Sequence, residues 1–144
     1  MPAPLPHHYD AEITWTSGKF GTLAAPPRPS IVGGAPPEFD GTPDHWSPEH
    51  LLLSALNLCL MQTYLAIAEK SRVGVRSYRA RAEGTVDKTD AGLAVTAVTV
   101  RMTLRVDETD VAKADELVAK AKKYCIVSNS VKAAVTVAAE ISPA

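Results

Sequence analysis

A long apolar run with clear helix-start signals constrains this fold more than any other segment. It is SPEHLLLSALNLCLMQTYLAIAEK, residues 47–70. Ser47 is a suitable N-cap, Pro48 suits the first helical position, and the charge of Glu49 is favourable at the positive end of a helix. Apolar residues then occur on every side from Leu51 to Ala68, so we expect a helix that is buried all round. Such a helix lies either centrally under a sheet or in a dimer interface.

Strand patterns follow this helix. Residues 93–107 alternate between apolar and polar, which is typical of a strand with one face in the core. Residues 73–87 should pair with them as an antiparallel hairpin, because residues 87–92 have turn composition. A second helix over roughly 108–124 has lysines near its end, as the helix dipole favours.

The N-terminal part reads as strands and a long loop. Further strands are predicted over 7–17, 22–25, 131–141 and, briefly, 30–32, with a hairpin turn at 17–21. Residues 26–48 carry seven prolines and three glycines, which indicates a loop that is either a substrate lid or a dimer arm. The order of strands, helix, hairpin, helix and strand defines an α+β fold in a single domain, 1–144.

Composition restricts the function. The net charge is −1 and the basic residues are dispersed, which argues against nucleic acid as a partner. The N-terminus lacks the pattern of a signal peptide, and polar residues interrupt the apolar run, so we expect no membrane span and a cytoplasmic protein. In that compartment a structural disulfide is improbable, which leaves catalysis, metal binding or packing for the two cysteines.

The residues alone do not decide between these roles. Cys59 would lie roughly 16 Å into its helix, beyond the reach of the helix dipole, where burial makes a thiol inert and packing is the simple interpretation. Cys125 follows three lysines, whose charges favour a thiolate. It also lies at the negative end of a helix, which disfavours a thiolate. A disulfide requires Cα atoms within about 7 Å. His45 and His50 have no metal-ligand spacing, so no metal or other cofactor is expected.

Two segments resemble motifs of the OsmC/Ohr family. In residues 47–70, Pro-Glu opens a helix and a cysteine follows ten residues after the glutamate; in KKYCIVSNSV, residues 122–131, a cysteine precedes a short Ser-Asn segment. The order of strands and helices agrees over nearly the whole chain. The resemblance implies an OsmC-like fold of antiparallel sheets with two main helices, assembled as an intertwined homodimer.

The resemblance also implies a thiol peroxidase that reduces organic hydroperoxides. Cys59 would be the peroxidatic thiol and Cys125 the resolving thiol, with a Cys59 sulfenic acid and a Cys59–Cys125 disulfide in the cycle. Glu49 would match a glutamate that pairs with a thiolate-stabilising arginine. At the matching turn this sequence has Lys19, which lacks the guanidinium fork, and Arg28 is the other candidate cation.

Helix geometry separates Glu49 from Cys59 by about 15 Å in one chain. We therefore predict either that Glu49 acts from the partner subunit or that the helix begins later. The external reductant would be a dithiol, such as that of a lipoylated protein. Candidates for an apolar substrate lining are Phe20, Phe39, Trp46, Met61, Tyr64 and Ile126. The alternatives left open are a non-catalytic dimer that binds a small apolar ligand and a redox sensor.

Overall fold

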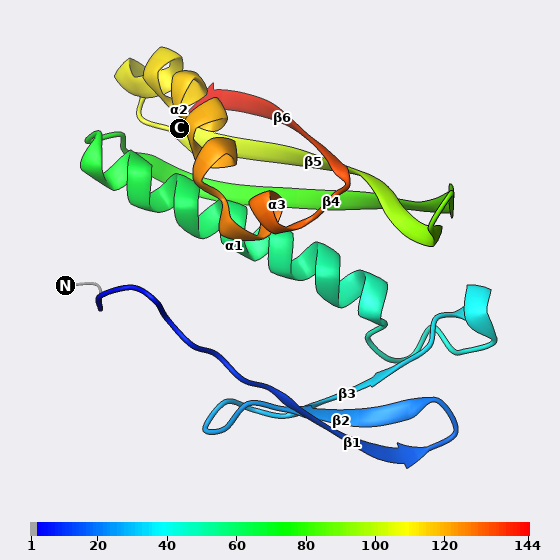
Figure 1. The fold of residues 1–144 in the computed structure, drawn as a ribbon. Helices are drawn as coiled ribbons and strands as arrows, with labels where there is room; N and C mark the ends of the chain where they lie inside the picture. The colour runs from blue at the N-terminus through cyan, green and yellow to red at the C-terminus, as the bar shows by residue number, and fades with distance from the viewer. Residues whose placement is uncertain (1–2) are drawn as a thin grey trace. The chain divides into compact units, whose positions relative to one another are not determined.

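The computed structural model describes residues 3–144, which form two compact units divided between Leu51 and Leu52. The first unit is an antiparallel sheet of three strands in the order β1-β2-β3 (Figure 1). The strands are β1 (Glu12–Ser17), β2 (Phe20–Ala24) and β3 (Ile31–Gly34), and a 3-10 turn, η1 (Pro37–Phe39), follows. The predicted strands and the predicted long loop are confirmed in outline.

Glycine enables two features of this small sheet. Gly18 has φ of +52°, a conformation that L side chains rarely adopt, in the tight turn that joins β1 to β2. Gly34 lies against the ring of Phe20, and an added Cβ would stand 2.6 Å from that ring. The strands can therefore pair closely while the aromatic side chain lies flat across the sheet.

The long helix α1 (Pro48–Lys70) begins where the sequence predicts. The backbone N–H of Leu51 donates to the Ser47 carbonyl at 2.9 Å, and the Ser47 hydroxyl accepts from the backbone N–H of His50 at 3.1 Å. This is the capping contact expected of a serine N-cap. A later start of the helix is therefore wrong.

The second unit is a three-stranded mixed sheet with helices on one face (Figure 1). Its strands are β4 (Val75–Thr89), β5 (Gly92–Val106) and β6 (Ala134–Pro143). The β4–β5 hairpin is antiparallel as predicted, and β6 pairs in parallel with β5, which makes the sheet mixed. The turn η2 (Glu108–Asp110) leads into α2 (Val111–Tyr124), and a short helix that the sequence did not predict, α3 (Ile126–Ser130), follows it.

One core holds this unit together. Every second residue of β5 is buried from Val98 to Val106, as strand alternation predicts. The same core contains buried residues of α1 and α2, so both helices cover one face of the sheet. The buried helix residues are Leu56, Leu60, Tyr64, Ala68, Ala114, Leu117 and Ala121.

Burial of α1 on all sides is wrong for a single chain. Its buried residues repeat every four positions, as one helix face does, while Leu58 is 52% exposed. An 18-residue window of α1 has a mean hydropathy of 1.7, enough by length and composition for a membrane span. Because the core helix of a globular unit has the same composition, and the buried face of α1 packs in the core, this is weak evidence for a membrane.

Candidate thiol site

The structure brings the two cysteines together within the second unit. Cys59 is half-buried on α1, Cys125 is completely buried between α2 and α3, and both are free thiols. Their side chains interact with each other, and the backbone N–H groups of Ile126 and Val127 act on the sulfur of Cys59. Residues far apart in sequence therefore meet at one sulfur pair.

Local backbone geometry places Cys125. Helix α2 ends at Tyr124, and Cys125 is extended, with φ −70° and ψ 110°. Its N–H donates to the Lys122 carbonyl at 3.3 Å, and its own carbonyl accepts from the N–H of Asn129 at 3.0 Å. Cys125 is thus the single residue between two helices, and its neighbours 126 and 127 turn toward Cys59.

Side chains fasten α3 to the end of α2. The Asn129 amide Nδ2 donates to the Lys123 carbonyl at 3.0 Å, which satisfies one of the carbonyls left open at the end of α2. The Ser130 hydroxyl donates to the Ile126 carbonyl at 2.7 Å. The Ser-Asn segment that carried the family resemblance therefore holds α3 against the end of α2.

Opposing influences set the pKa of Cys59. Burial is the largest and raises it, but the backbone N–H of Val127, the thiol of Cys125 and the backbone N–H of Ile126 favour the thiolate and together outweigh burial. The pKa of Cys59 is therefore lowered. The Thr63 hydroxyl adds little, because its one hydrogen already donates to the Cys59 carbonyl at 2.8 Å. Within the described second unit, none of these donors carries a formal charge.

The pKa of Cys125 moves in the opposite direction. Burial raises it, and although the backbone N–H of Ser128 favours the thiolate, the hydrogen bond toward Cys59 and the charge of a Cys59 thiolate raise the pKa further. The two thiols thus have different environments and different favoured protonation states. Cys59 suits a nucleophile, and Cys125 suits a proton donor that acts second.

Two tyrosines lie beside the pair. Tyr64 is fully buried, and its hydroxyl donates to the Ala114 carbonyl at 2.8 Å, which ties α1 to α2. The ring of Tyr78 lies 6.0 Å from it, and the Tyr78 hydroxyl is buried without a hydrogen-bond partner. Burial, with the nearby charges of Tyr64 and Cys125, raises the pKa of Tyr78 to about 12. Tyr64, predicted as a substrate contact, is a core residue in this chain.

Glu49 occupies the first turn of α1, as predicted. It is half-buried, and its Oε1 is buried without a hydrogen-bond partner among the described residues. Because α1 is one continuous helix, Glu49 and Cys59 of one chain stand about 15 Å apart along its axis. This side chain therefore lacks a partner within the described chain, which is costly for a buried carboxylate oxygen.

The two candidate cations belong to the first unit. The Lys19 ammonium donates to the Phe39 carbonyl at 3.2 Å, an exposed contact that ties the β1–β2 turn to η1. Arg28 is exposed, and its backbone N–H closes a turn to the Ala25 carbonyl at 3.1 Å.

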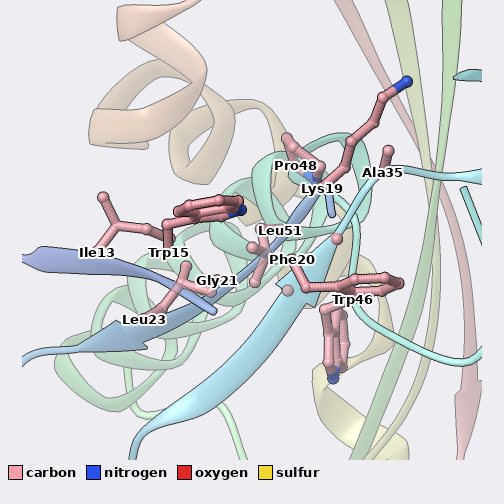
Figure 2. Close-up of a pocket in the computed structure, with 12 residues that line it drawn as sticks. Ile13, Trp15, Lys19, Phe20, Gly21, Leu23, Ala35, Trp46, Pro48 and Leu51 are labelled. Carbon is pink, nitrogen blue, oxygen red and sulfur yellow. The ribbon is translucent and has the colours of Figure 1, made fainter. Parts of the chain in front are cut away.

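A groove of about 620 Å³ lies in the first unit (Figure 2). Phe20 and Trp46, two of the predicted apolar residues, line it together with Trp15, which the sequence did not single out. Alternation along β1 could have indicated Trp15, because Ile13 and Trp15 share one face of that strand. In Figure 2 the Lys19 amine extends away from these aromatic rings. Phe39 is exposed and lies outside the groove.

The remaining predicted residues are in the second unit. Met61 is half-buried and lines a smaller cavity of about 260 Å³ beside Asn57 and Tyr78. Ile126 is 74% exposed at the start of α3, directly after Cys125. Among residues 3–144, no group of three or more His, Cys, Asp or Glu side chains could hold a metal ion.

Fold and site together define a thiol protein of OsmC-like architecture, and sequence comparison agrees. The OsmC family, described as OsmC-like protein, matches residues 41–140, and the chain belongs to this family. It is 26% identical over 142 residues to the uncharacterized protein YmaD of Bacillus subtilis, with 94% of each chain covered.

Solved structures have the same fold. An OsmC-like protein of unknown function from Vibrio cholerae superposes with a TM-score of 0.86 at 23% identity, covering 94% of this chain and 100% of the other. An organic hydroperoxide resistance protein OsmC from Legionella pneumophila superposes with a TM-score of 0.73 at 19% identity, covering 96% of this chain and 99% of the other. An organic hydroperoxide resistance protein from Elizabethkingia anophelis superposes with a TM-score of 0.72 at 17% identity, covering 97% of this chain and 100% of the other. These likenesses establish the fold.

Proposed function

We propose that this protein is a thiol peroxidase that reduces organic hydroperoxides. The observation that carries the proposal is the interaction of Cys59 with Cys125, in surroundings that favour the thiolate of the first and the protonated thiol of the second. Membership of the OsmC family and two similar folds named as organic hydroperoxide resistance proteins support it.

The first step is oxidation of Cys59. Its thiolate attacks the distal oxygen of the hydroperoxide, so that an S–O bond forms and the O–O bond breaks. Sulfur supplies two electrons and becomes a sulfenic acid, and the leaving alkoxide takes a proton to become the alcohol. The Cys125 thiol interacts with this sulfur in the reduced chain and would supply that proton.

The second step is resolution by Cys125. Its sulfur, now a thiolate, attacks the sulfur of the Cys59 sulfenic acid, so that an S–S bond forms, the S–O bond breaks and hydroxide leaves. The hydroxide takes a proton from solvent and becomes water. An external dithiol then reopens the disulfide by thiol–disulfide exchange and is itself oxidised to a disulfide. Because the thiols already interact in the reduced chain, the disulfide requires little rearrangement of the backbone.

We infer that the working form is a homodimer in the cytoplasm. The half-exposed face of α1, with Leu58, is apolar and would be covered in a dimer. The unpartnered Glu49 oxygen would receive its donor from the second subunit, as the sequence predicts. This arrangement would also bring a cation of one subunit to the thiol site of the other.

The deciding experiment measures consumption of cumene hydroperoxide by the reduced protein with dihydrolipoamide as electron donor. Hydrogen peroxide serves as the comparison substrate and Cys59→Ser as the inactive variant. We expect turnover that is faster with the organic substrate and is abolished by the substitution. Absence of turnover, with both thiols still free after exposure to peroxide, would overturn the proposal.

A second candidate function is favoured by the groove of the first unit. Its volume of about 620 Å³ and its aromatic lining suit a small apolar ligand that is bound without chemistry. In that case Cys59→Ser would leave ligand binding unchanged, and the thiols would stay reduced under peroxide. Quenching of Trp15 and Trp46 fluorescence by apolar compounds would reveal such binding.

A further inference from the structure

The sheet of β4, β5 and β6 has one face without helices, which we call the open face. Helices α1 and α2 pack against the face that carries Val98, Val100 and Met102, so the alternate residues of each strand point the other way (Figure 1). The strand register gives the residues of the open face. They are Ser77, Arg79, Arg81 and Glu83 on β4, Thr99, Arg101, Thr103 and Arg105 on β5, and Thr136, Ala138, Glu140 and Ser142 on β6.

Arginine is concentrated on the open face. Four of the seven arginines of the chain lie there, all of them exposed, and none of the eight lysines does. In the sequence these arginines belong to two separate segments, and the pairing of β4 with β5 brings the segments together. Positive charge that is dispersed along the chain is therefore gathered on one surface.

The four arginines form a track along the β4–β5 pair. Arg105 and Arg79 occupy two successive cross-strand pairs of the open face, and Arg81 lies directly opposite Arg101 in the next pair. Because a strand rises about 3.4 Å per residue, successive pairs on one face are about 7 Å apart and the track is about 14 Å long. Each step of this repeat thus presents at least one guanidinium group.

The charge of the track is not neutralised within the described chain. Arg81 and Arg101 share one acidic neighbour, and their Nε atoms lie 3.6 and 3.5 Å from Oε1 of Glu83. The two arginine side chains are 82% and 62% exposed, so these contacts add little stability. Among the described residues Arg79 and Arg105 form no ion pair. Since like charges directly opposite each other destabilise a sheet, folding alone does not explain this arrangement.

The repeat of the track matches an extended acidic peptide. A guanidinium group binds a carboxylate through two parallel hydrogen bonds, which the ammonium group of a lysine cannot do. An extended peptide with an acidic residue at every second position carries its carboxylates on one side, also about 7 Å apart. The hydroxyls of Ser77 and Thr103, beside the arginines, can accept from or donate to the backbone of such a peptide.

We propose that the open face of the sheet binds an extended acidic peptide segment of a partner protein, with carboxylates at alternate positions paired to the arginine track. The inference goes beyond the proposed peroxidase function and does not depend on it. Cys59 and Cys125 belong to the core on the opposite, helix-covered side of the sheet. Binding at the open face therefore involves no thiol.

The surroundings of the track favour a peptide over other polyanions. Glu83 follows the track on β4, and Glu140 of β6 lies beside Thr103. These carboxylates repel a uniform phosphate polymer, whereas a peptide can place a neutral or basic side chain next to each of them. The open face has no aromatic residue on which a nucleobase could stack. It also has no large apolar side chain that could enter a lipid bilayer.

The test measures binding of labelled peptides by fluorescence anisotropy. In the first peptide glutamates alternate with serines, in the second glutamines replace the glutamates, and the third has the composition of the first with its glutamates contiguous. We expect the alternating peptide to bind roughly tenfold more tightly than the glutamine peptide at low salt. It should bind roughly threefold more tightly than its isomer, because contiguous side chains point to both sides of an extended chain. The advantage over glutamine should disappear at about 0.5 M NaCl.

Variants of the facing arginines locate the site. Arg81→Gln combined with Arg101→Gln should weaken binding roughly tenfold and leave the free energy of unfolding unchanged or raised, because the repulsion is removed. Changing both to lysine keeps the charge but loses the fork and should restore only part of the affinity. Lys120→Gln combined with Lys122→Gln makes the same change of charge on α2, which covers the other face, and should leave binding unchanged.

Each outcome supports or overturns the proposal. Equal affinities for the alternating and the glutamine peptide would overturn it, and the salt titration of the unmodified protein needs no variant. Affinity kept by the double glutamine variant would overturn the location. Tighter binding of inorganic polyphosphate or single-stranded RNA than of the alternating peptide would overturn the peptide as the occupant. Cys59→Ser should bind the peptide normally, so loss of peroxidase activity and loss of peptide binding are distinguishable.

Discussion

The thiol of Cys125 favours the thiolate of Cys59, and the charge of that thiolate keeps Cys125 protonated. The proposed order of the chemistry requires such a difference, and within the second unit it arises without a cation. We expect Cys59 to react with iodoacetamide at a pH where Cys125 does not, because only its pKa is lowered. Mass spectrometry after brief alkylation at a series of pH values would locate each modification.

A pair of variants isolates the contribution of Cys125. Cys125→Ala removes the donor, so the pKa of Cys59 should rise and its alkylation rate at neutral pH should fall several-fold. Cys125→Ser keeps a hydrogen-bond donor at the same position and should retain most of the reactivity. Equal pH profiles for the two variants would mean that the backbone N–H groups alone stabilise the thiolate.

The attachment of α3 offers a more distant test. Asn129→Ala removes the hydrogen bond to the Lys123 carbonyl, which should cost about 0.5–1.5 kcal/mol of stability. The N–H groups of Ile126 and Val127 would be held less firmly, so the pKa of Cys59 should rise as well. The pH profile of alkylation measures the second effect. Asn129→Asp, which keeps an oxygen but loses the amide donor, should behave like the alanine variant.

The Tyr64 hydroxyl has a hydrogen-bond partner and the buried Tyr78 hydroxyl has none. Removal of each hydroxyl therefore gives a matched comparison of its effect on stability. Tyr64→Phe leaves the buried Ala114 carbonyl without its donor, and we expect a loss of about 1–3 kcal/mol. Tyr78→Phe removes a buried hydroxyl that has no partner and should be neutral or stabilising. The measurement is the free energy of unfolding in urea. A large loss for Tyr78→Phe would reveal a partner for its hydroxyl, such as a second subunit.

The sequence predicted the elements well where a local signal exists. Ser47, Pro48 and Glu49 fixed the start of α1, and alternation from Val98 to Val106 identified the buried face of β5. Burial of α1 on all sides was wrong because periodicity reports apolar character and not which neighbour covers it. The parallel pairing of β6 with β5 and the short helix α3 depend on tertiary contacts that no local pattern encodes.

The site was predictable only in part for the same reason. The motif around Cys125 singled out a residue that interacts with Cys59, and that proximity comes from the packing of α2 and α3 against α1. A sequence search for a stabilising charge led to Lys19 and Arg28. Within the second unit the structure supplies uncharged donors, the backbone N–H groups of residues 126 and 127, which almost any residue type would offer at these positions. Side-chain identity therefore gave no signal.

The role of Lys19 is the last point that can be tested sharply. If the donors of the second unit suffice, Lys19→Ala should leave the pKa of Cys59 unchanged, because backbone N–H groups and the Cys125 thiol of that unit already outweigh burial. The variant loses only the exposed bond to the Phe39 carbonyl, so the loss of stability should be small, at most about 1 kcal/mol. Lys19→Arg is the matched control, since it keeps the charge and restores the guanidinium fork. A raised pKa of Cys59 in the alanine variant, with a normal one in the arginine variant, would mean that Lys19 reaches a thiol in the assembled protein.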